Sequence, residues 1–327
     1  MMNIRKKSAM PAIIVSMMIV SSTLSLAATQ GPNLAAAQSP PPPSSSSPDL
    51  FAFKKSNTQT NSTEVYVVSG TNPQQLLLQT GTALPETDET YEFAVDDWNH
   101  DGTADVVAIK MSNTGTNSTE LQILDGASNF TSFLVQTGTA LPETDETYDF
   151  GFDDWNSDGT SDLVAIKMSN TETNSTEIQV LNGASNFTAF LVQTGTALPQ
   201  AGEEFDFAVD DWNNDGTADV VAIKMSNTGT NSTEIQVVSG ANPQEFLVQT
   251  GTVLPQADEE FDFAADDWNS DGTSDLVAIK IGDTDTNSTE LDIVSGASPL
   301  EFLVQTGTAL PETDDTYDFD TWKAQQQ

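Results

Sequence analysis

Apolar and polar positions alternate along this chain in short segments, and the same segments return about every 57 residues. In one copy, residues 91–96 alternate, residues 105–110 form an apolar β-branched run, and residues 119–124 alternate again. A last apolar stretch, residues 133–137, completes the copy. Period-two alternation and short apolar runs between turn residues predict four short strands per copy and no helix.

The number of copies predicts a closed ring. Four antiparallel strands per copy are typical of a propeller blade. The sequence of the last strand occurs five times, whereas the complete first strand with its loop occurs four times. The first copy lacks its first strand and begins midway at residues 51–54, and residues 317–322 form a surplus first strand at the other end of the chain. We therefore predict an all-β fold, a five-bladed β-propeller of four-stranded antiparallel blades whose first blade is closed by the C-terminal strand. A solenoid would need polar caps rather than complementary fragments.

Four copies carry an acidic loop, Asp-Trp-Asn-x-Asp-Gly-Thr-x-Asp, between the first two strands. Three alternate side-chain oxygens, the threonine carbonyl and the last aspartate form an oxygen cage that suits Ca²⁺ better than Zn²⁺, copper or Mg²⁺. A solvated turn without an ion is the alternative, but four copies in register favour four structural calcium sites. The predicted ligands are Asp97, Asn99, Asp101, Thr103 and Asp105; Asp154, Asn156, Asp158, Thr160 and Asp162; Asp211, Asn213, Asp215, Thr217 and Asp219; and Asp267, Asn269, Asp271, Thr273 and Asp275.

The loop and its setting resemble the FG-GAP/VCBS repeats of integrin-alpha-like β-propellers, in which this motif binds calcium between the first two strands of a blade. The phrases at 163–167 and 183–187 resemble repeats of secreted microbial proteins, sometimes found beside glycoside hydrolase domains. The resemblance covers residues 49–322. It implies calcium binding but no particular ligand, and five blades depart from the seven that are frequent in that family.

The N-terminal region predicts export. Residues 1–28 combine basic residues, an apolar run and small residues in the order of a secretory signal peptide; an uncleaved membrane anchor is the alternative. Residues 29–48 form a Pro/Ser-rich linker, 49–323 the propeller and 324–327 a tail. We expect a secreted or cell-surface protein with no direct membrane insertion after signal cleavage.

Charge and composition exclude several functions. With 49 acidic and 10 basic side chains, the net charge of −39 repels nucleic acids. Disulfides and thiol chemistry are excluded because there is no cysteine. His100 is the only histidine, and we expect a solvated loop residue. Because calcium accounts for most of the repeated acids, no unique catalytic pair stands out, and we predict that the protein is not an enzyme.

Two repeated features leave alternatives open. The tryptophans either stack on sugars or pack on a neighbouring blade, and their regular spacing favours packing; they are Trp98, Trp155, Trp212, Trp268 and Trp322. Asn-x-Ser/Thr sequons either predict a glycoprotein or merely suit turns. They begin at Asn61, Asn117, Asn129, Asn174, Asn186, Asn231 and Asn287.

These features together predict an exported, calcium-stabilised β-propeller binding module for carbohydrate recognition or cell-surface adhesion. Its partners would be glycans or surface proteins, since repeated blades offer equivalent sites and multivalent avidity. The alternative is a structural cell-surface or matrix protein without a discrete ligand.

Overall fold

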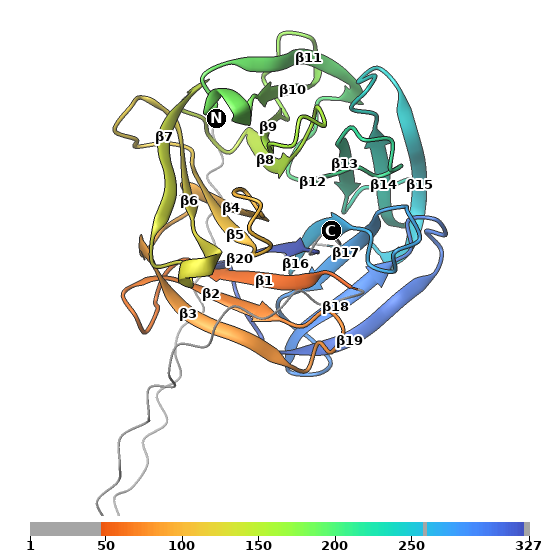
Figure 1. The fold of residues 1–327 in the computed structure, drawn as a ribbon. Coiled ribbons are helices and arrows are strands. Elements are labelled where there is room, and N and C mark those ends of the chain that lie inside the picture. Colours follow the sequence, from red (N-terminus) through yellow and green to blue (C-terminus); the bar gives the residue numbers. More distant parts are fainter. Residues whose placement is uncertain (1–46, 258–259, 324–327) are drawn as a thin grey trace, which may run out of the picture. The chain divides into compact units, whose positions relative to one another are not determined.

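The computed structural model describes residues 47–257 and 260–323, which form a ring of five four-stranded antiparallel sheets (Figure 1). This confirms the predicted five-bladed propeller. The predicted signal peptide (1–28), nearly all of the linker (29–46) and the tail (324–327) lie outside the described residues. Within the described ranges, no helix is long and apolar enough to span a membrane.

Each sheet places one strand at each of four distances from the axis of the ring (Figure 1). The innermost strands are β4 (Tyr91–Asp96), β8 (Tyr148–Asp153), β12 (Phe205–Asp210), β16 (Phe261–Asp266) and β20 (Tyr317–Trp322). The second strands are β1 (Asp49–Lys54), β5 (Asp105–Lys110), β9 (Asp162–Lys167), β13 (Asp219–Lys224) and β17 (Asp275–Lys280). The third strands are β2 (Ser62–Val68), β6 (Ser118–Leu124), β10 (Ser175–Leu181), β14 (Ser232–Val238) and β18 (Ser288–Val294). The outer strands are β3 (Leu76–Pro85), β7 (Phe133–Pro142), β11 (Phe190–Pro199), β15 (Phe246–Pro255) and β19 (Phe302–Pro311). Two 3-10 turns, η1 (Gly126–Ser128) and η2 (Gly183–Ser185), follow β6 and β10.

The C-terminal strand closes the first sheet, whose order is β20-β1-β2-β3. It pairs antiparallel with β1, with Asp320 opposite Phe51. The carboxylates of Asp318 and Asp320 also accept hydrogen bonds from the N–H groups of Phe93 (3.0 Å) and Val95 (2.7 Å) in β4. The closing strand is therefore attached to the first blade through its backbone and to the second blade through two side chains.

The rim of the ring carries one equivalent backbone hydrogen bond at every blade interface. An N–H near the end of each outer strand donates to a carbonyl of the next blade, at 2.7 to 2.9 Å. The donor–acceptor pairs are Ala83–Phe130, Ala140–Phe187, Ala197–Pro243, Val253–Pro299 and Ala309–Pro73. The last pair joins the fifth blade to the first, so the rim is closed as well as the axis.

The core consists of five apolar clusters in which side chains of neighbouring blades interlock. Trp98 packs on Phe152 and Phe187 of the next blade, with ring centroids 5.8 and 5.3 Å away. Trp98 is partly buried, whereas Trp155, Trp212 and Trp268 are fully buried in the clusters of three other blade interfaces. This confirms the packing interpretation of these tryptophans.

Trp322 differs from the other four tryptophans. It pairs with Asp49, whereas Asp96 pairs with Asp105, so Trp322 occupies the register position of Asp96 rather than that of Trp98. It packs, partly buried, against the cluster between the first and second blades.

Candidate functional site

The innermost strands bring two kinds of side chain to the axis. Asp318 and Asp320 of β20 contact Phe93 and Val95 of β4 in ascending order, so these neighbouring strands run in the same direction. The repeat gives all five the same orientation. Their first residues are aromatic and their second residues are acidic, whereas the predicted calcium loops follow the last residues of β4, β8, β12 and β16. The axis therefore has an aromatic end and a loop end.

Five carboxyl groups form what we call the inner acid ring. Its members are Glu92, Asp149, Asp206, Asp262 and Asp318. The negative charge of Asp206 raises the pKa of Glu92, and that of Asp262 raises the pKa of Asp149. Since these pairs come from blades that are not adjacent, their charges interact across the axis.

Burial is the main cause of the raised pKa values in the inner acid ring. It raises the pKa of Asp149 to about 7, although hydrogen bonds from Phe150 and Phe207 N–H groups oppose the rise. Repulsion between carboxylates adds to burial at Glu92 and Asp206. The ring is thus a group of acids that resists full ionisation near neutral pH.

More acids lie toward the loop end of the axis. Asp96, Asp153, Asp210 and Asp266 end their strands, and burial raises the pKa of Asp210 to about 8. Ser274 of the next blade donates a hydrogen bond to Asp210, and Ser161 donates one to Asp96.

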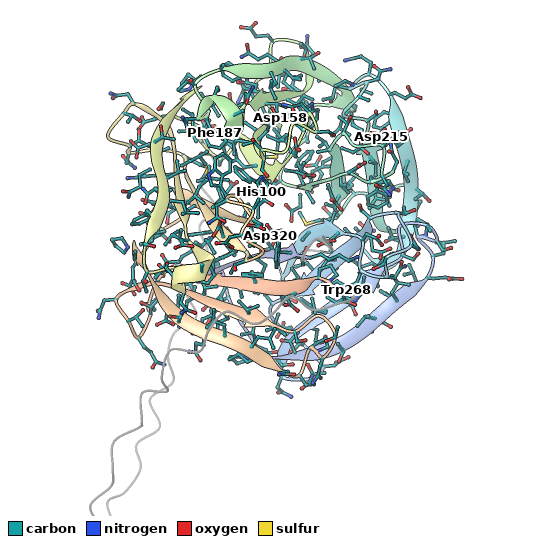
Figure 2. The ribbon with its side chains drawn as sticks, viewed as in Figure 1. His100, Asp158, Phe187, Asp215, Trp268 and Asp320 are labelled. Atoms are coloured by element: carbon teal, nitrogen blue, oxygen red, sulfur yellow. The ribbon has the colours of Figure 1, made fainter. Side chains whose placement is uncertain are left out.

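Asp320 has no acidic counterpart in the other innermost strands. Where β20 carries this aspartate, β4, β12 and β16 have alanine and β8 has glycine. Figure 2 shows Asp320 near the middle of the ring. Burial raises the pKa of Asp320 to about 7. The acids around the axis are therefore not fully symmetric, contrary to the impression that the repeats give.

The aromatic end of the axis also carries lysines. Lys54, Lys110, Lys167 and Lys224, each the last residue of a second strand, lie 5.6 to 5.7 Å above an aromatic ring. The partly exposed aromatic residues at this end are Tyr91, Tyr148, Phe205, Phe261 and Tyr317. A ligand at this end would meet aromatic faces, ammonium groups and, one residue further along each strand, carboxyl groups.

The four acidic loops hold their shape through their own hydrogen bonds. Both carboxylate oxygens of Asp97 accept backbone N–H groups, from Asp101 (3.0 Å) and Gly102 (2.8 Å). Asp101 in turn accepts the N–H of Thr103 at 2.9 Å. Gly102 has φ +86°, a conformation that side-chain-bearing residues rarely adopt. The same bonds recur in the other three loops.

The last aspartate of each loop is fully buried. Oδ1 of Asp105 accepts a hydrogen bond from the N–H of Gly126 (2.7 Å), whereas its Oδ2 is buried and has no hydrogen-bond partner. Oδ2 of Asp219 is likewise buried without a hydrogen-bond partner. A buried carboxylate oxygen is costly unless a donor or a cation meets it, so these atoms fit an oxygen-coordinated ion. Burial raises the pKa of Asp105 and Asp219 to about 7. Across residues 47–257 and 260–323, however, no three acidic or imidazole side chains converge closely enough to form a metal cluster.

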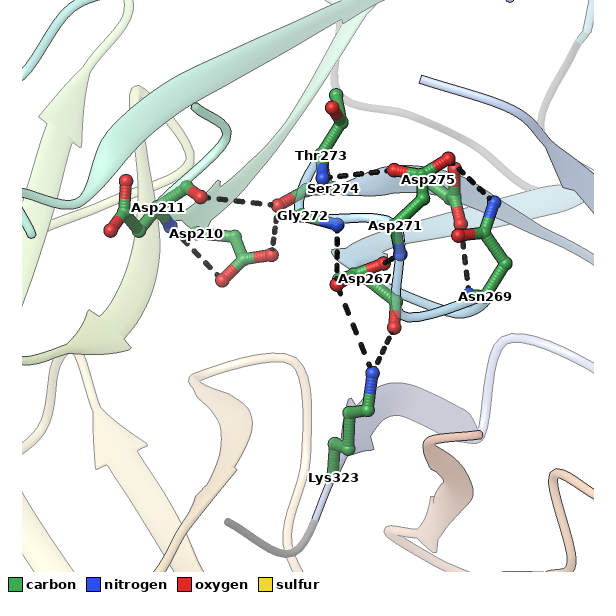
Figure 3. Close-up of polar contacts among 10 residues, drawn as sticks. All are labelled: Asp210, Asp211, Asp267, Asn269, Asp271, Gly272, Thr273, Ser274, Asp275 and Lys323. Carbon is green, nitrogen blue, oxygen red and sulfur yellow. Dashed lines mark hydrogen bonds and ion pairs between the residues drawn. The ribbon is translucent and has the colours of Figure 1, made fainter. Parts of the chain in front are cut away.

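Neighbouring loops contact one another. The ring of His100 lies 2.5 Å from the carbonyl oxygen of Gly159 in the next loop, so this histidine connects two loops instead of being merely solvated. Ser157 donates to the carbonyl of Gly216 in the same relation. At the fourth loop, Lys323 donates to the carbonyl of Asp267 (Figure 3). Lys323 follows β20, which has no loop of its own.

The sequon asparagines all adopt positive φ, which this residue type tolerates in turns. In the five Asn-Ser-Thr turns the threonine is buried, and its hydroxyl donates to the carbonyl of the proline that ends the outer strand, as from Thr119 to Pro142 (2.9 Å). The turn interpretation explains these residues; glycosylation remains a prediction.

No family model matches this chain, and no curated protein matches it. Among solved structures, it is similar to the Cellvibrio cellulosa alpha-L-arabinanase complexed with arabinohexaose, with a TM-score of 0.43 and 13% identity over 78% of this chain and 90% of that chain. It is also similar to an exo-1,5-alpha-L-arabinanase from a bovine ruminal metagenomic library, with a TM-score of 0.39 and 11% identity over 72% of this chain and 89% of that one. Neither match is to an FG-GAP/VCBS protein, so that resemblance stays a prediction beyond the propeller fold.

The reasoning behind the prediction that the protein is not an enzyme is wrong. It assumed that calcium loops account for most of the acids, whereas the inner acid ring and Asp320 lie outside the loops and surround the axis. Sequence reasoning missed these acids because it treated the second residue of each first strand as part of an alternating strand pattern. Their recurrence at one position of the innermost strand was the available signal.

Proposed function

We propose that the protein is an exported, calcium-stabilised propeller that recognises carbohydrate at the inner acid ring. The observation that carries this proposal is a set of five carboxyl groups on the innermost strands, which influence one another's pKa values across the axis and lie beside partly exposed aromatic rings. Trp155, Trp212 and Trp268 are buried and not available to sugars, and Trp98 and Trp322 pack partly buried against neighbouring blades, so the axis is a better candidate than the tryptophan positions.

The chemistry of the ring suits a neutral, hydroxyl-rich ligand. Ionised carboxylates accept hydrogen bonds from hydroxyl groups, and a protonated carboxyl group can also donate one. Aromatic faces pack against the apolar side of a ligand while a few polar groups orient it. An anionic polymer is a poor candidate, because the chain carries a net charge of −39.

Binding is testable with neutral oligosaccharides, first on a glycan array and then by isothermal titration calorimetry. We expect Asp149→Asn together with Asp206→Asn to abolish binding to a glycan that the wild type holds. Glu146→Gln, which removes a charge from an exposed side chain, is the matched control and should bind as the wild type does. A double variant with wild-type affinity would reject the axial site.

Hydrolysis is a second candidate, favoured by the unequal environments of the acids. Glycoside hydrolysis needs one protonated carboxyl group and one ionised carboxylate on either side of the scissile bond. A ring in which burial holds some acids protonated can contain both. Release of reducing ends from neutral polysaccharides is the assay; absence of turnover from every glycan that binds would reject hydrolysis and leave recognition.

Calcium in the four loops is part of the proposal. Asp97, Asn99, Asp101 and Asp105, the carbonyl of Thr103 and their counterparts would hold it, and the partnerless oxygens of Asp105 and Asp219 support this assignment. Equilibrium dialysis with ⁴⁵Ca²⁺ should give about four ions per chain, the number of loops that carry the motif. Stoichiometry unchanged in Asp219→Asn would contradict the third site.

Export is proposed from residues 1–28 alone. N-terminal sequencing of the protein recovered from the culture medium should show a chain that begins near residue 29, the end of the predicted signal. Recovery of the full-length chain from the cytosol would contradict it.

A further inference from the structure

Lys323 brings an ammonium group to the fourth acidic loop. Its Nζ donates a hydrogen bond to the carbonyl of Asp267 and lies 4.0 Å from Oδ2 of the same residue (Figure 3). Both side chains are largely covered, with 25% of Lys323 and 28% of Asp267 exposed. Asp267 is the first predicted calcium ligand of this loop. The chain therefore places its own positive charge beside a carboxylate on which calcium would depend.

The other three loops have an acid where the fourth has this lysine. Trp322 occupies the register position of Asp96, so Lys323 follows at the position that the first aspartate of a loop holds in the other blades. Each of the first three loops is thus followed, at this position of the next blade, by an aspartate: Asp154, Asp211 and Asp267. The charge next to the fourth loop is reversed because β20 ends the propeller without a loop of its own.

No other lysine or arginine of residues 47–257 and 260–323 lies at this end of the axis. The remaining lysines end a second strand or directly follow one, and the last residues of these strands lie at the aromatic end. His100, the one imidazole, reaches the carbonyl of Gly159 rather than a carboxylate. Within the described ranges, an ammonium beside a first loop aspartate is thus a property of the fourth loop alone.

The fourth loop keeps its shape but shares the carboxylate. The N–H groups of Asp271 and Thr273 still make their bonds within the loop, each at 3.0 Å. Oδ2 of Asp267 accepts the N–H of Gly272 at 3.1 Å, whereas the same bond measures 2.7 to 2.8 Å in the other loops. An oxygen that faces both an ammonium and an N–H group attracts a further cation less strongly. The loops therefore differ in charge rather than in form.

We propose that Lys323 makes the fourth loop the weakest of the four calcium sites, so that the chain binds three calcium ions tightly and one loosely. This inference rests on the proposed binding of calcium by the loops. A monovalent and a divalent cation about 6 Å apart in water repel by an energy that corresponds to about tenfold in an equilibrium constant. We therefore expect the dissociation constant of the fourth site to be about tenfold higher. When calcium is scarce, the ammonium still attaches the end of β20 to this loop.

The test is isothermal titration calorimetry of the whole mature protein with CaCl₂ at low ionic strength, after chelator has removed bound ions. The wild type should bind three ions in one class and a fourth about tenfold more weakly. Lys323→Met should bind four ions in one class, because the repulsion is gone. Lys323→Arg keeps the charge and should retain three tight ions and one weak ion. Lys280→Met is the matched control. It removes the same charge from the blade of the fourth loop, but Lys280 donates to the carbonyl of Asp283 (2.7 Å) at the aromatic end, so the wild-type pattern should persist.

A second background isolates the fourth site. Asp101→Asn, Asp158→Asn and Asp215→Asn together change one exposed ligand in each of the other loops and leave the fourth loop intact. In this background Lys323→Met should lower the dissociation constant about tenfold at low ionic strength. The difference should shrink in 0.5 M NaCl, because salt screens charges that are partly exposed. A lysine that only anchors β20 would change the melting temperature without calcium and leave the dissociation constant unchanged.

Four equivalent ions in the wild type, or a weak site that persists in Lys323→Met, would overturn the proposal. Should Lys323→Met fail to fold, Lys323→Gln provides the neutral side chain for the same comparison. Failure of the proposed calcium binding would look different: no ion would bind to any loop. Equal binding at all four loops would reject only the role of Lys323.

Discussion

Asp149→Asn tests whether the inner acid ring opposes folding at neutral pH. Asp149 has its pKa raised by burial from 3.8 to about 7 in the folded protein. A carboxyl group with a raised folded pKa contributes stability that is fully present below its ordinary pKa. That stability is lost as the pH rises through about 7. The wild type should therefore lose stability between pH 5 and pH 8, and the asparagine variant should lose less.

The size of the difference follows from proton linkage. A carboxyl group whose pKa is 3.8 in the unfolded chain and about 7 in the folded protein lowers the free energy of unfolding by about 2–3 kcal/mol between pH 5 and pH 8. This is an upper bound, because Asp149 is partly exposed toward the axis and solvent screens part of the effect. The loops contribute equally to both proteins and cancel in the comparison. The charge of Asp149 also raises the pKa values of Glu92 and Asp206, so removing it lowers these pKa values and adds to the difference in the same direction.

The assay is urea unfolding followed by tryptophan fluorescence at pH 5 and pH 8, at one ionic strength and in chelator. The free energy of unfolding of Asp149→Asn minus that of the wild type should be larger, meaning a relatively more stable variant, at pH 8 than at pH 5. Glu146→Gln should show no such pH dependence, because its side chain is exposed. A difference between Asp149→Asn and the wild type that does not change with pH would refute the reasoning.

Three further outcomes follow from the structure. Saturation of the four loops at ten times their dissociation constant should stabilise the protein by about 1.4 kcal/mol per site, so chelator should lower the melting temperature; an unchanged midpoint would contradict calcium binding. Phe187→Ala should lower the free energy of unfolding by about 3–5 kcal/mol, because Phe187 is fully buried against Trp98 of the preceding blade. Differential scanning calorimetry measures this change, and a loss under 1 kcal/mol would contradict the packing. A chain that stops before Tyr317 lacks β20 and exposes the edge of β1, so it should aggregate in light scattering; a monomeric, cooperatively folded truncated chain would show that closure is dispensable.

The sequence predicted the architecture because the relevant signals are local and repeated. Period-two alternation, such as that of residues 91–96, matches a strand with one face toward each neighbouring blade. The surplus strand 317–322 matched the strand missing from the first copy, and it pairs with β1 as expected. Trp322 was placed in the wrong register, because counting one tryptophan per blade ignores the strand pairing that puts it opposite Asp49.

The candidate site was not predictable in the same way. Glu92 and Asp206 are 114 positions apart and look like ordinary polar residues of two alternating strands. Their charges interact only because ring closure brings every innermost strand to one axis. The acidic loops, whose residues are close in sequence, were visible from spacing alone.

The sequence by itself therefore determined the repeat, the number of blades, the closing strand and the composition of the acidic loops. Each of these depends on residues within one blade or on the count of copies. Only the tertiary structure decided which acids meet at the axis. The physical reason is that charges interact through space: burial and proximity across the ring set the pKa values of these acids, and neither is encoded in the spacing of residues along the chain.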